Sequence, residues 1–376
     1  MNNRIYFDNA ATTPLDIEVL EAMTEVMKTT FGNPSSTHSY GREARTIIEE
    51  ARKTISKLLN CSPGELFFTS GGTEADNMAI RKSVDCLGVT NIITSPIEHH
   101  AVLHTVEDLE KKGMVKKHFV KLLPNGHIDI VHLEELLIKN SNSLVSLMHI
   151  NNEIGNILDI EKVSELCEKY HTIFHSDTVQ TLGHFPIDLQ KIKVDFIACS
   201  AHKFHGPKGV GFIYINSRNS ISPFITGGSQ ERDMRGGTEN IYGIVGLAKA
   251  FEISVRDMEK NYLYISSIKN YMMERLKKKL EGIEFNGDAE GKTSYTILNV
   301  LFPPTPIAEM MLFKLDIAGI STSGGSACAS GSNVGSHVLT ALGVDSNKPA
   351  IRFSFGKQNT QQDVDIAVEK LSEILK

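Results

Sequence analysis

Apolar residues in the first 215 positions occur in two patterns that follow one another along the chain. Helical spacing predicts helices over 15–30, 41–59, 73–87, 100–112, 131–139 and 160–171. Short apolar runs between them predict strands at 66–69, 91–94, 116–121, 143–150, 172–176, 195–199 and 211–215. Apolar strands separated by helices are typical of a mostly parallel sheet buried on both faces. The pattern therefore predicts an α/β fold whose mostly parallel, mixed sheet is flanked by helices.

The pattern changes after Gly236. A long helical stretch covers 240–281, and the elements expected after it are a strand at 293–302, helices at 306–316 and 334–342, a strand at 350–355 and a helix at 361–375. This order predicts a smaller α+β domain. A length of 376 residues also fits two domains better than one. We expect a large domain over 14–255, and a small domain made of 1–13 and 256–376.

The composition is that of an ordinary globular protein and excludes several classes of partner. Hydrophobic residues make up 41% of the chain, charged residues 22%, and the formal net charge is −6. This balance argues against a nucleic-acid partner. No apolar run approaches the roughly 18–20 residues of a membrane helix, and the N-terminus lacks the apolar core of a signal peptide. We therefore expect neither a membrane partner nor secretion.

Five cysteines are scattered along the chain without a CxxC pair. An odd, scattered set is typical of reduced thiols in a cytoplasmic protein, and it does not predict a disulfide framework or a zinc site. Cys328 differs from the others because it lies in SGGSACASGS, from Ser323 to Ser332. A glycine-serine segment has permissive backbone angles and few side chains to pack, so it can allow a thiol to move over some distance.

Ligands of open α/β sheets bind at the carboxyl ends of the strands, so the residues that follow each strand are candidates. In LFFTSGGTEADN, the N–H groups of Gly72 and Thr73 stand at a predicted helix start and could hold a phosphate. Thr73 could equally be an ordinary N-cap. The absence of a following Gly-Lys-Ser/Thr excludes a Walker A loop.

Two further strand ends carry polar residues. TIFHSDTVQTLG ends a strand at Asp177 and places Gln180 three residues later, as ligand contacts or as cap and turn residues. DFIACSAHKFHGPKG ends a buried strand at Ser200, His202 and Lys203. A lysine directly after a buried strand is a candidate nucleophile or Schiff-base former, whereas most turn lysines are simply solvated.

Histidine and arginine residues add candidates with two interpretations each. PIEHHAVLH contains His99, His100 and His104. The spacing of His100 and His104 would suit a metal pair on a helix, but no third ligand is evident, and a histidine could instead stack on an aromatic ligand. Arg352, in the apolar run AIRFSFG, could pair with a structural carboxylate or with that of a substrate.

One cofactor accounts for all of these candidates together. Pyridoxal phosphate (PLP) needs a lysine, an acid for its pyridine nitrogen and a cup for its phosphate. Each signal alone is weak, but the phosphate turn, the acid, the lysine and the histidine occur together. The sequence therefore predicts a PLP site without a metal ion.

The motifs also resemble, in order, those of cysteine desulfurases in the class V aminotransferase superfamily of fold type I PLP enzymes. They are FDNAATTP, FGNPSSTHSYG, TSGGTEADN, EHHAVL, NNEIGN, HSDTVQTLG, SAHKFHGPKGVG, MRGGTEN, SGGSACASGS and IRFSFG. The resemblance covers essentially the whole chain. The cysteine segment is similar to that of group I, which serves nitrogen fixation and iron–sulfur assembly. It reads Ser-Gly-Gly-Ser-Ala-Cys where many relatives have Ser-Ser-Gly-Ser-Ala-Cys.

The resemblance implies a role for each candidate. Lys203 matches the cofactor-binding and catalytic lysine, Cys328 the nucleophile that forms a persulfide, and His99 the imidazole that stacks on the ring. Arg352 matches the clamp on the substrate carboxylate. The remaining cofactor contacts implied are Gly72, Thr73, Asn152, Asp177, Gln180, Ser200, His202 and, from the other subunit, Thr238.

The activity implied is that of a PLP-dependent cysteine desulfurase, which converts L-cysteine to L-alanine. The sulfur would form a persulfide on Cys328 and pass to an acceptor protein, such as an iron–sulfur scaffold or a thiolation protein. A selenocysteine lyase or a cysteine/cystine β-lyase of the same fold is the alternative, because these enzymes share the lysine, the acid and the phosphate cup. The resemblance also implies a homodimer, and we expect it in the cytoplasm.

Overall fold

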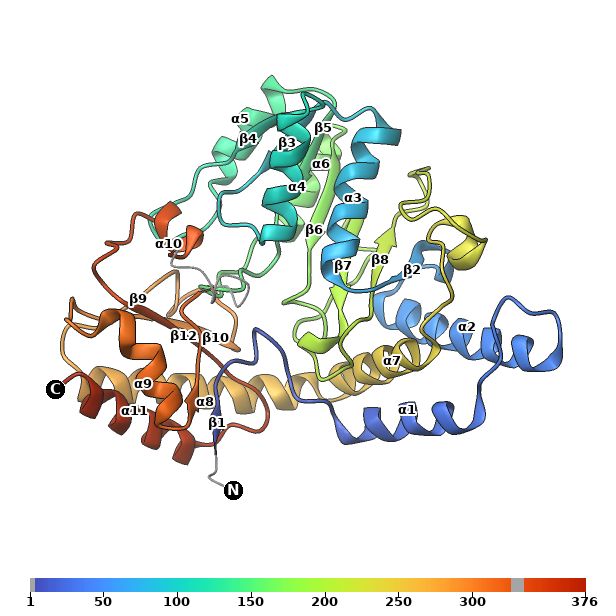
Figure 1. The fold of residues 1–376 in the computed structure, drawn as a ribbon. Coiled ribbons are helices and arrows are strands. Elements are labelled where there is room, and N and C mark those ends of the chain that lie inside the picture. The colour runs from blue at the N-terminus through green and yellow to red at the C-terminus, as the bar shows by residue number, and fades with distance from the viewer. Residues whose placement is uncertain (1–3, 326–334) are drawn as a thin grey trace.

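A computed structural model describes residues 4–325 and 335–376 of the chain (Figure 1). Its largest element is a seven-stranded sheet in the order β2-β8-β7-β6-β5-β3-β4. The strands are β2 (Leu66–Thr69), β3 (Asn91–Thr94), β4 (Lys116–Phe119), β5 (Ser143–Ser146), β6 (Ile173–Asp177), β7 (Phe196–Ser200) and β8 (Gly211–Ile215). Neighbouring strands are parallel except for β8, which runs antiparallel to both β2 and β7. The predicted mixed, mostly parallel sheet is confirmed.

Helices cover both faces of this sheet because alternate strand residues point to opposite sides. On one face, α4 (His100–Lys111) packs over β3 and β5, and α3 (Gly72–Leu87) packs on residues such as Phe67 and Ile213. On the other, their strand neighbours Phe68 and Phe212 belong to the largest apolar cluster. The helices of that cluster are α1 (Ile17–Thr29), α2 (Ser39–Leu59), α5 (Ile130–Lys139), α6 (Ile160–Lys169) and α7 (Ile241–Arg256). Figure 1 shows α1 running beside α7.

A second apolar core lies in the C-terminal part of the chain. It is built around a three-stranded antiparallel sheet in the order β12-β10-β9, and around the parallel pair β1 and β11. The strands are β1 (Ile5–Tyr6), β9 (Glu284–Phe285), β10 (Ile297–Leu301), β11 (Ile320–Ser321) and β12 (Ala350–Ser354). The helices are α8 (Met258–Lys279), α9 (Met311–Ile317) and α11 (Gln361–Ile374), whereas α10 (His337–Ala341) packs in a separate small cluster with Ile97 and Ile154. Strand β1 thus joins the N-terminus to this second core.

The two cores separate at the junction of α7 and α8. The sequence predicts one helical stretch over 240–281, whereas the structure ends α7 at Arg256 and starts α8 at Met258, with Asp257 between them. Asp257 has φ −101° and ψ 8°, outside the α-helical region. We propose that this break is the boundary between the large domain (14–255) and the small domain (1–13 with 256–376).

Several predicted elements are longer than the observed ones. The strand predicted at 143–150 is β5, over Ser143–Ser146. Beyond it, Leu147 and His149 still donate their N–H groups to carbonyl oxygens of β6, while Met148 and Ile150 line a cavity. The strand predicted at 293–302 is β10, over Ile297–Leu301. The helix predicted at 334–342 is α10, over His337–Ala341. Within the described ranges, no helix combines the length and the apolar character needed to span a membrane.

Candidate active site

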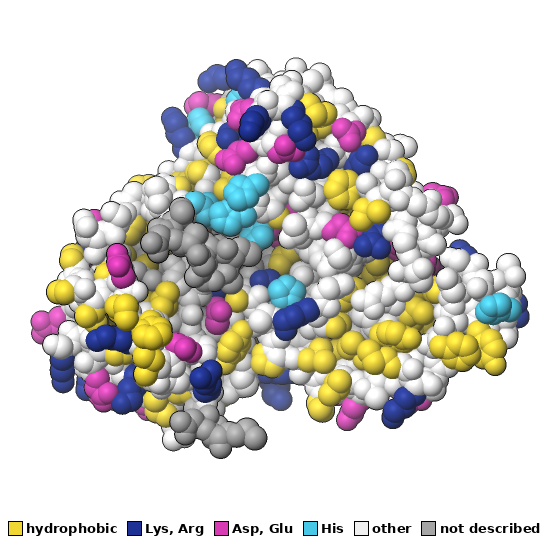
Figure 2. Space-filling view, in the orientation of Figure 1, with side chains coloured by type: hydrophobic (Ala, Val, Ile, Leu, Met, Phe, Trp, Pro, Cys, Tyr) yellow, Lys and Arg dark blue, Asp and Glu magenta, His cyan; other side chains and the backbone are white. Residues whose placement is uncertain are grey.

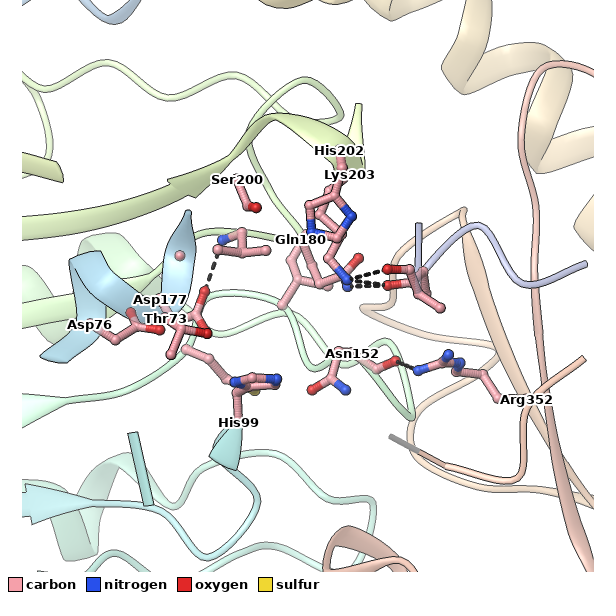
Figure 3. A pocket seen from close by; sticks show the side chains of 16 residues that line it. Thr73, Asp76, His99, Asn152, Asp177, Gln180, Ser200, His202, Lys203 and Arg352 are labelled. Atoms are coloured by element: carbon pink, nitrogen blue, oxygen red, sulfur yellow. Dashed lines mark hydrogen bonds between the residues drawn. The ribbon is translucent and has the colours of Figure 1, made fainter. Parts of the chain in front are cut away.

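A cavity of about 200 Å³ opens where the parallel strands of the large sheet end (Figure 3). Asp177 is the last residue of β6, Ser200 is the last residue of β7, and Gly72 starts α3. The topology brings these residues together because neighbouring parallel strands end at the same edge. Ten of the residues that the sequence singles out line this cavity: Gly72, Thr73, His99, Asn152, Asp177, Gln180, Ser200, His202, Lys203 and Arg352.

Lys203 projects into the cavity from a short 3₁₀ turn, Ala201–Lys203, that directly follows β7. Its Nζ donates hydrogen bonds to the carbonyl oxygens of Ala10 (2.7 Å) and Ala11 (2.8 Å). The N-terminal segment therefore holds the amine beside the strand end that carries the acid. A lysine held in this way can react with an aldehyde and can carry a proton.

Asp177 forms the acidic end of the cavity together with Asp76 of α3. Asp177 is buried, and its Oδ1 accepts the N–H of Val179 at 2.9 Å. Burial raises the pKa of Asp177, although the Val179 N–H and the Lys203 amine oppose this rise. Burial, followed by the charges of Asp177 and Glu98, raises the pKa of Asp76 well above its ordinary value. Two carboxyl groups that are buried side by side favour a proton or a positive charge next to them. A protonated pyridine nitrogen would supply such a charge.

His99 lies over the same part of the cavity. It caps α4, because its Nδ1 accepts the N–H of Ala101 at 3.1 Å. The pKa of His99 is lowered to about 4, mainly because the ring is buried and also because the positive charge of Lys203 lies nearby. The imidazole is therefore neutral at pH 7, with its proton on Nε2. A neutral, fixed ring of this kind can stack on an aromatic ligand without adding charge to it.

The start of α3 provides a cradle for an anion. Its N-cap residue, Gly71, has φ +152° and offers no side-chain hydrogen bond, so the first N–H groups of the helix are not capped. At Gly72, an added Cβ would lie 2.5 Å from Cγ2 of Val179, so only glycine fits there. Thr73, Ser200 and His202 line the cavity beside this helix start. Uncapped N–H groups with hydroxyl neighbours fit the phosphate of PLP.

Arg352 lies at the opposite end of the cavity, in β12 of the C-terminal core (Figure 3). Its side chain is only 1% exposed, and its Nη2 forms an ion pair with Asp8 at 2.8 Å. Its Nη1 donates to the carbonyl oxygen of Asn152, also at 2.8 Å. The Nε of Arg352 has no hydrogen-bond partner in the part of the chain that the structure describes. The guanidinium is therefore fixed in direction before any substrate carboxylate arrives.

Two predicted site residues, Thr238 and Cys328, are not among the described residues that line this cavity. Thr238 is exposed, and it lines a separate cavity with Phe68, Glu231 and Arg235. Its proposed contact with the cofactor would have to be made in another subunit, as the resemblance implies. Cys328 lies outside the described residues.

The histidines considered as a metal pair form a cluster of rings at the surface (Figure 2). The ring of His100 lies 4.8 Å from that of His104 and 4.5 Å from that of His337. In the described parts of the chain, however, the three metal-binding side chains whose ligand atoms lie within 4.8 Å of one another are Asp76, His99 and Asp177. These three line the PLP-like cavity, and the adjacent lysine and anion cradle fit the cofactor better than an ion.

Sequence reasoning missed four contributors to the site. Asp8 pairs with Arg352, the carbonyl groups of Ala10 and Ala11 hold Lys203, and Asp76 stands beside Asp177. The first three belong to FDNAATTP, a polar and small-residue stretch directly after an apolar strand. Asp76 follows Thr73 by three residues, so both face the same side of α3.

The mixed sheet with a lysine, an acid and an anion cradle at its strand ends defines a PLP-dependent enzyme of fold type I. The sequence profile of the class V aminotransferases matches residues 5–366, and the chain belongs to this family. The family uses PLP, and the cavity described above fits that cofactor.

Curated relatives extend over the full length of the chain. The cysteine desulfurase IscS of Dictyoglomus turgidum is 42% identical over 382 residues, which cover 100% of this chain and 95% of the relative. The putative cysteine desulfurase IscS 1 of Bacillus subtilis is also 42% identical and covers 99% of both chains.

Solved structures are also similar to this chain over nearly its whole length. A NifS-like protein superposes with a TM-score of 0.91 at 38% identity, covering 99% of both chains. A structure described as SspA in complex with cysteine has a TM-score of 0.82 at 30% identity, and it covers 95% of this chain and 100% of its own.

Proposed function

We propose that the chain is a PLP-dependent cysteine desulfurase, which converts L-cysteine to L-alanine. The observation that carries this proposal is a single cavity that joins an anion cradle, an acid pair, Lys203 and Arg352. Relatives named cysteine desulfurase, alike over the whole chain, support it. A solved relative described as a complex with cysteine supports the substrate.

Each residue would have one task. When bound, PLP supplies an electron sink for the negative charge that develops on the substrate. Arg352 binds the cysteine carboxylate, and Asp177 keeps a proton at the pyridine nitrogen. Lys203 would accept a proton from the substrate at Nζ and return it to the product. His99 covers the ring without adding charge, because its pKa is lowered to about 4.

Cys328 would receive the sulfur. Its thiolate attacks the sulfur of the bound cysteine, a sulfur–sulfur bond forms, and the bond from that sulfur to Cβ breaks. The electron pair left on the carbon takes up a proton. One cysteine and one protein thiol thus give one alanine and one persulfide, so the atoms balance without an added oxidant.

We further propose that the enzyme is a homodimer in the cytoplasm that passes its persulfide sulfur to an acceptor protein. The exposed position of Thr238, away from the cavity of its own chain, supports a contribution across a subunit interface. An iron–sulfur scaffold is the acceptor that the names of the IscS relatives favour.

Mass spectrometry of the purified protein incubated with L-cysteine tests the function. We expect alanine in the solution and an added sulfur atom on the peptide that contains Cys328. Cys328→Ser should abolish both. If Cys328→Ser still makes alanine from cysteine at the wild-type rate, the protein is a lyase of the same fold. Covalent binding of PLP by Lys203→Ala would show that the assigned lysine is wrong.

A further inference from the structure

A buried carboxylate follows Asn152 of the cavity lining and is not part of the chemistry described so far. Glu153 follows Asn152 in the turn that leaves β5, and its side chain has no exposed surface. One oxygen, Oε2, accepts the hydroxyl of Ser336 at 2.5 Å. The other, Oε1, is buried and has no hydrogen-bond partner among the described residues. Keeping a carboxylate in such a place is costly, and unsatisfied buried groups of this kind often have a functional reason.

The same carboxylate lies beside a second chain segment. An added Cβ at Gly325 would lie 3.2 Å from Oε2 of Glu153 and 3.3 Å from Cβ of Ser336, so little space separates Gly325 from these two side chains. Gly325 and Ser336 lie on either side of Cys328 in the sequence. Glu153 therefore binds the flank that follows the cysteine and lies beside the flank that precedes it.

The turn that carries Glu153 is itself tied to the substrate end of the cavity. The Glu153 N–H donates to Oδ1 of Asn151 at 2.9 Å, and its carbonyl oxygen accepts Nδ2 of Asn299 at 3.2 Å. The carbonyl oxygen of the preceding Asn152 accepts Nη1 of Arg352 at 2.8 Å.

The flank before Cys328 is connected to the same arginine. The N–H of Arg352 donates to the carbonyl oxygen of Ser323 at 2.7 Å, and the Ser323 hydroxyl donates to the carbonyl oxygen of Gly325 at 2.9 Å. Hydrogen bonds therefore connect the proposed substrate clamp to both flanks of the cysteine segment, directly to Ser323 and, through the turn that carries Glu153, to Ser336.

We propose that Glu153 is a positioning residue for sulfur transfer, an inference that rests on the proposed desulfurase function. Its carboxylate fixes Gly325 and Ser336 relative to Arg352, and it thereby sets how often the Cys328 thiol meets the substrate sulfur. A tethered group reacts at a rate that depends on its effective concentration, which falls when the ends of the tether are released. Cofactor and cysteine binding do not depend on this contact.

The test compares holoenzyme variants Glu153→Ala, Glu153→Gln and Ser336→Ala in single-turnover experiments. Loss of a hydrogen bond to a charged group should slow persulfide formation on Cys328 about tenfold or more. The KM for cysteine and the absorbance of the bound cofactor should stay within about twofold of wild type. Glu153→Gln should be affected least, because its amide oxygen can still accept the Ser336 hydroxyl. Hydrogen exchange in residues 335–342 should rise in Glu153→Ala.

The control variant is Thr360→Ala. Ser336 caps α10, and Thr360 caps α11, so both alanine variants lose a helix cap, but only Ser336→Ala loses a contact with Glu153. Persulfide formation slowed equally by both variants, or unchanged in Glu153→Ala, would overturn the proposal. A parallel loss of cofactor binding in Glu153→Ala would show that the residue only supports the fold. Hydrogen exchange needs no desulfurase activity, so it tests the contact even if the wild type makes no alanine.

Discussion

At the scale of single residues, the surroundings of Arg352 determine how strongly the site would bind a substrate carboxylate. Its guanidinium is almost fully buried and already has one counter-charge, Asp8, at 2.8 Å. A buried ion pair loses stability when one partner is removed, because the remaining charge stays desolvated. Asp8 therefore stabilises the unliganded site, and it competes with any incoming carboxylate for the same cation.

Asp8→Asn should bind carboxylate ligands more tightly while making the unliganded protein less stable. The amide keeps the shape of the side chain and a hydrogen-bond acceptor but removes the charge. We expect the free energy of unfolding to fall by about 3 kcal/mol. The affinity for L-alanine should rise about fivefold, equivalent to about 1 kcal/mol.

Calorimetric titration with alanine, and unfolding with and without it, would measure both effects. Asp16→Asn is the control, because Asp16 caps α1 and also pairs with a cation, Lys357, but this cation is 37% exposed and lies outside the cavity. Weaker alanine binding by Asp8→Asn would mean that Asp8 acts by orienting Arg352 and does not compete with the ligand.

At the scale of elements, the start of α3 is the feature on which cofactor binding should depend most. The helix begins in contact with Val179, just beyond β6, and no side chain caps its first N–H groups. A phosphate would therefore complete the helix as well as bind to it. The fit is close enough to leave no room for a side chain at Gly72.

Gly72→Ala should weaken PLP binding, because the new Cβ would stand 2.5 Å from Val179 and push the helix start away. Overpacking of this size costs about 1–3 kcal/mol, so the Kd for PLP should rise at least fivefold. Equilibrium binding followed by cofactor absorbance measures this change.

Gly88→Ala at the opposite end of α3 is the matched control. Gly88 has φ +70° with open space around it, so alanine there should cost about 1 kcal/mol of stability without changing the Kd for PLP. Equal losses of affinity in the two variants would mean that helix stability, and not the cradle, controls binding.

Elements with a strong apolar pattern could be predicted from the sequence, whereas short ones could not. The strands at 66–69, 91–94 and 211–215 are predicted to the residue, because continuous apolar runs end there at polar or turn residues. Strands β1, β9 and β11 have two residues each, too few for any periodicity. The pairing of β1 with β11 depends on a partner more than 300 residues away, which no local pattern reveals.

The same limit applies to the site. Asp177 and Lys203 could be predicted because each directly follows an apolar strand. The hydrogen bonds from Lys203 to Ala10 and Ala11 join residues almost 200 positions apart, and the pair of Asp8 with Arg352 spans 344 positions. Such contacts follow from tertiary packing and leave no trace in spacing.

Considered as a whole, the part of the molecule that the structure describes has one buried lysine. Lys269 of α8 is 3% exposed, and its Nζ donates to the carbonyl oxygen of Ser294 at 2.7 Å. Burial lowers the pKa of Lys269 to about 8. No ion pair of Lys269 occurs in residues 4–325 or 335–376. The unfolded chain keeps this lysine charged up to its ordinary pKa of about 10.4, so the fold loses stability below that value.

Wild-type protein should gain stability relative to Lys269→Met as the pH rises from about 8 to about 10. The native amine is neutral above its lowered pKa, while the unfolded one still binds a proton, so the gain is of the order of 2–3 kcal/mol. Below pH 8 the difference between the two proteins should be constant. Urea unfolding at several pH values measures it, and a difference that stays flat up to pH 10 would contradict the lowered pKa.

Mixed dimers would test whether two chains build one site. If Thr238 acts across an interface, Thr238→Ala and Lys203→Ala fall in the same site of a mixed dimer, so one of its two sites has both defects and the other has none. Mixing the two variants should then restore up to about a quarter of wild-type activity, because half of the dimers are mixed and each has one intact site. Activity no higher than the average of the two variants would show that Thr238 serves its own chain.

The position of β1 has a consequence for the order in which the protein is made. Residues 5–11 are synthesised long before their partners, because β1 pairs with β11, Ala10 receives a hydrogen bond from Lys203, and the Ala10 N–H donates to the Ser354 hydroxyl. The contacts of this segment are therefore complete only after β11 and β12 have been made. The large core can fold earlier during synthesis, but the cavity is complete only when β12 is present, so the cofactor is best loaded after that point.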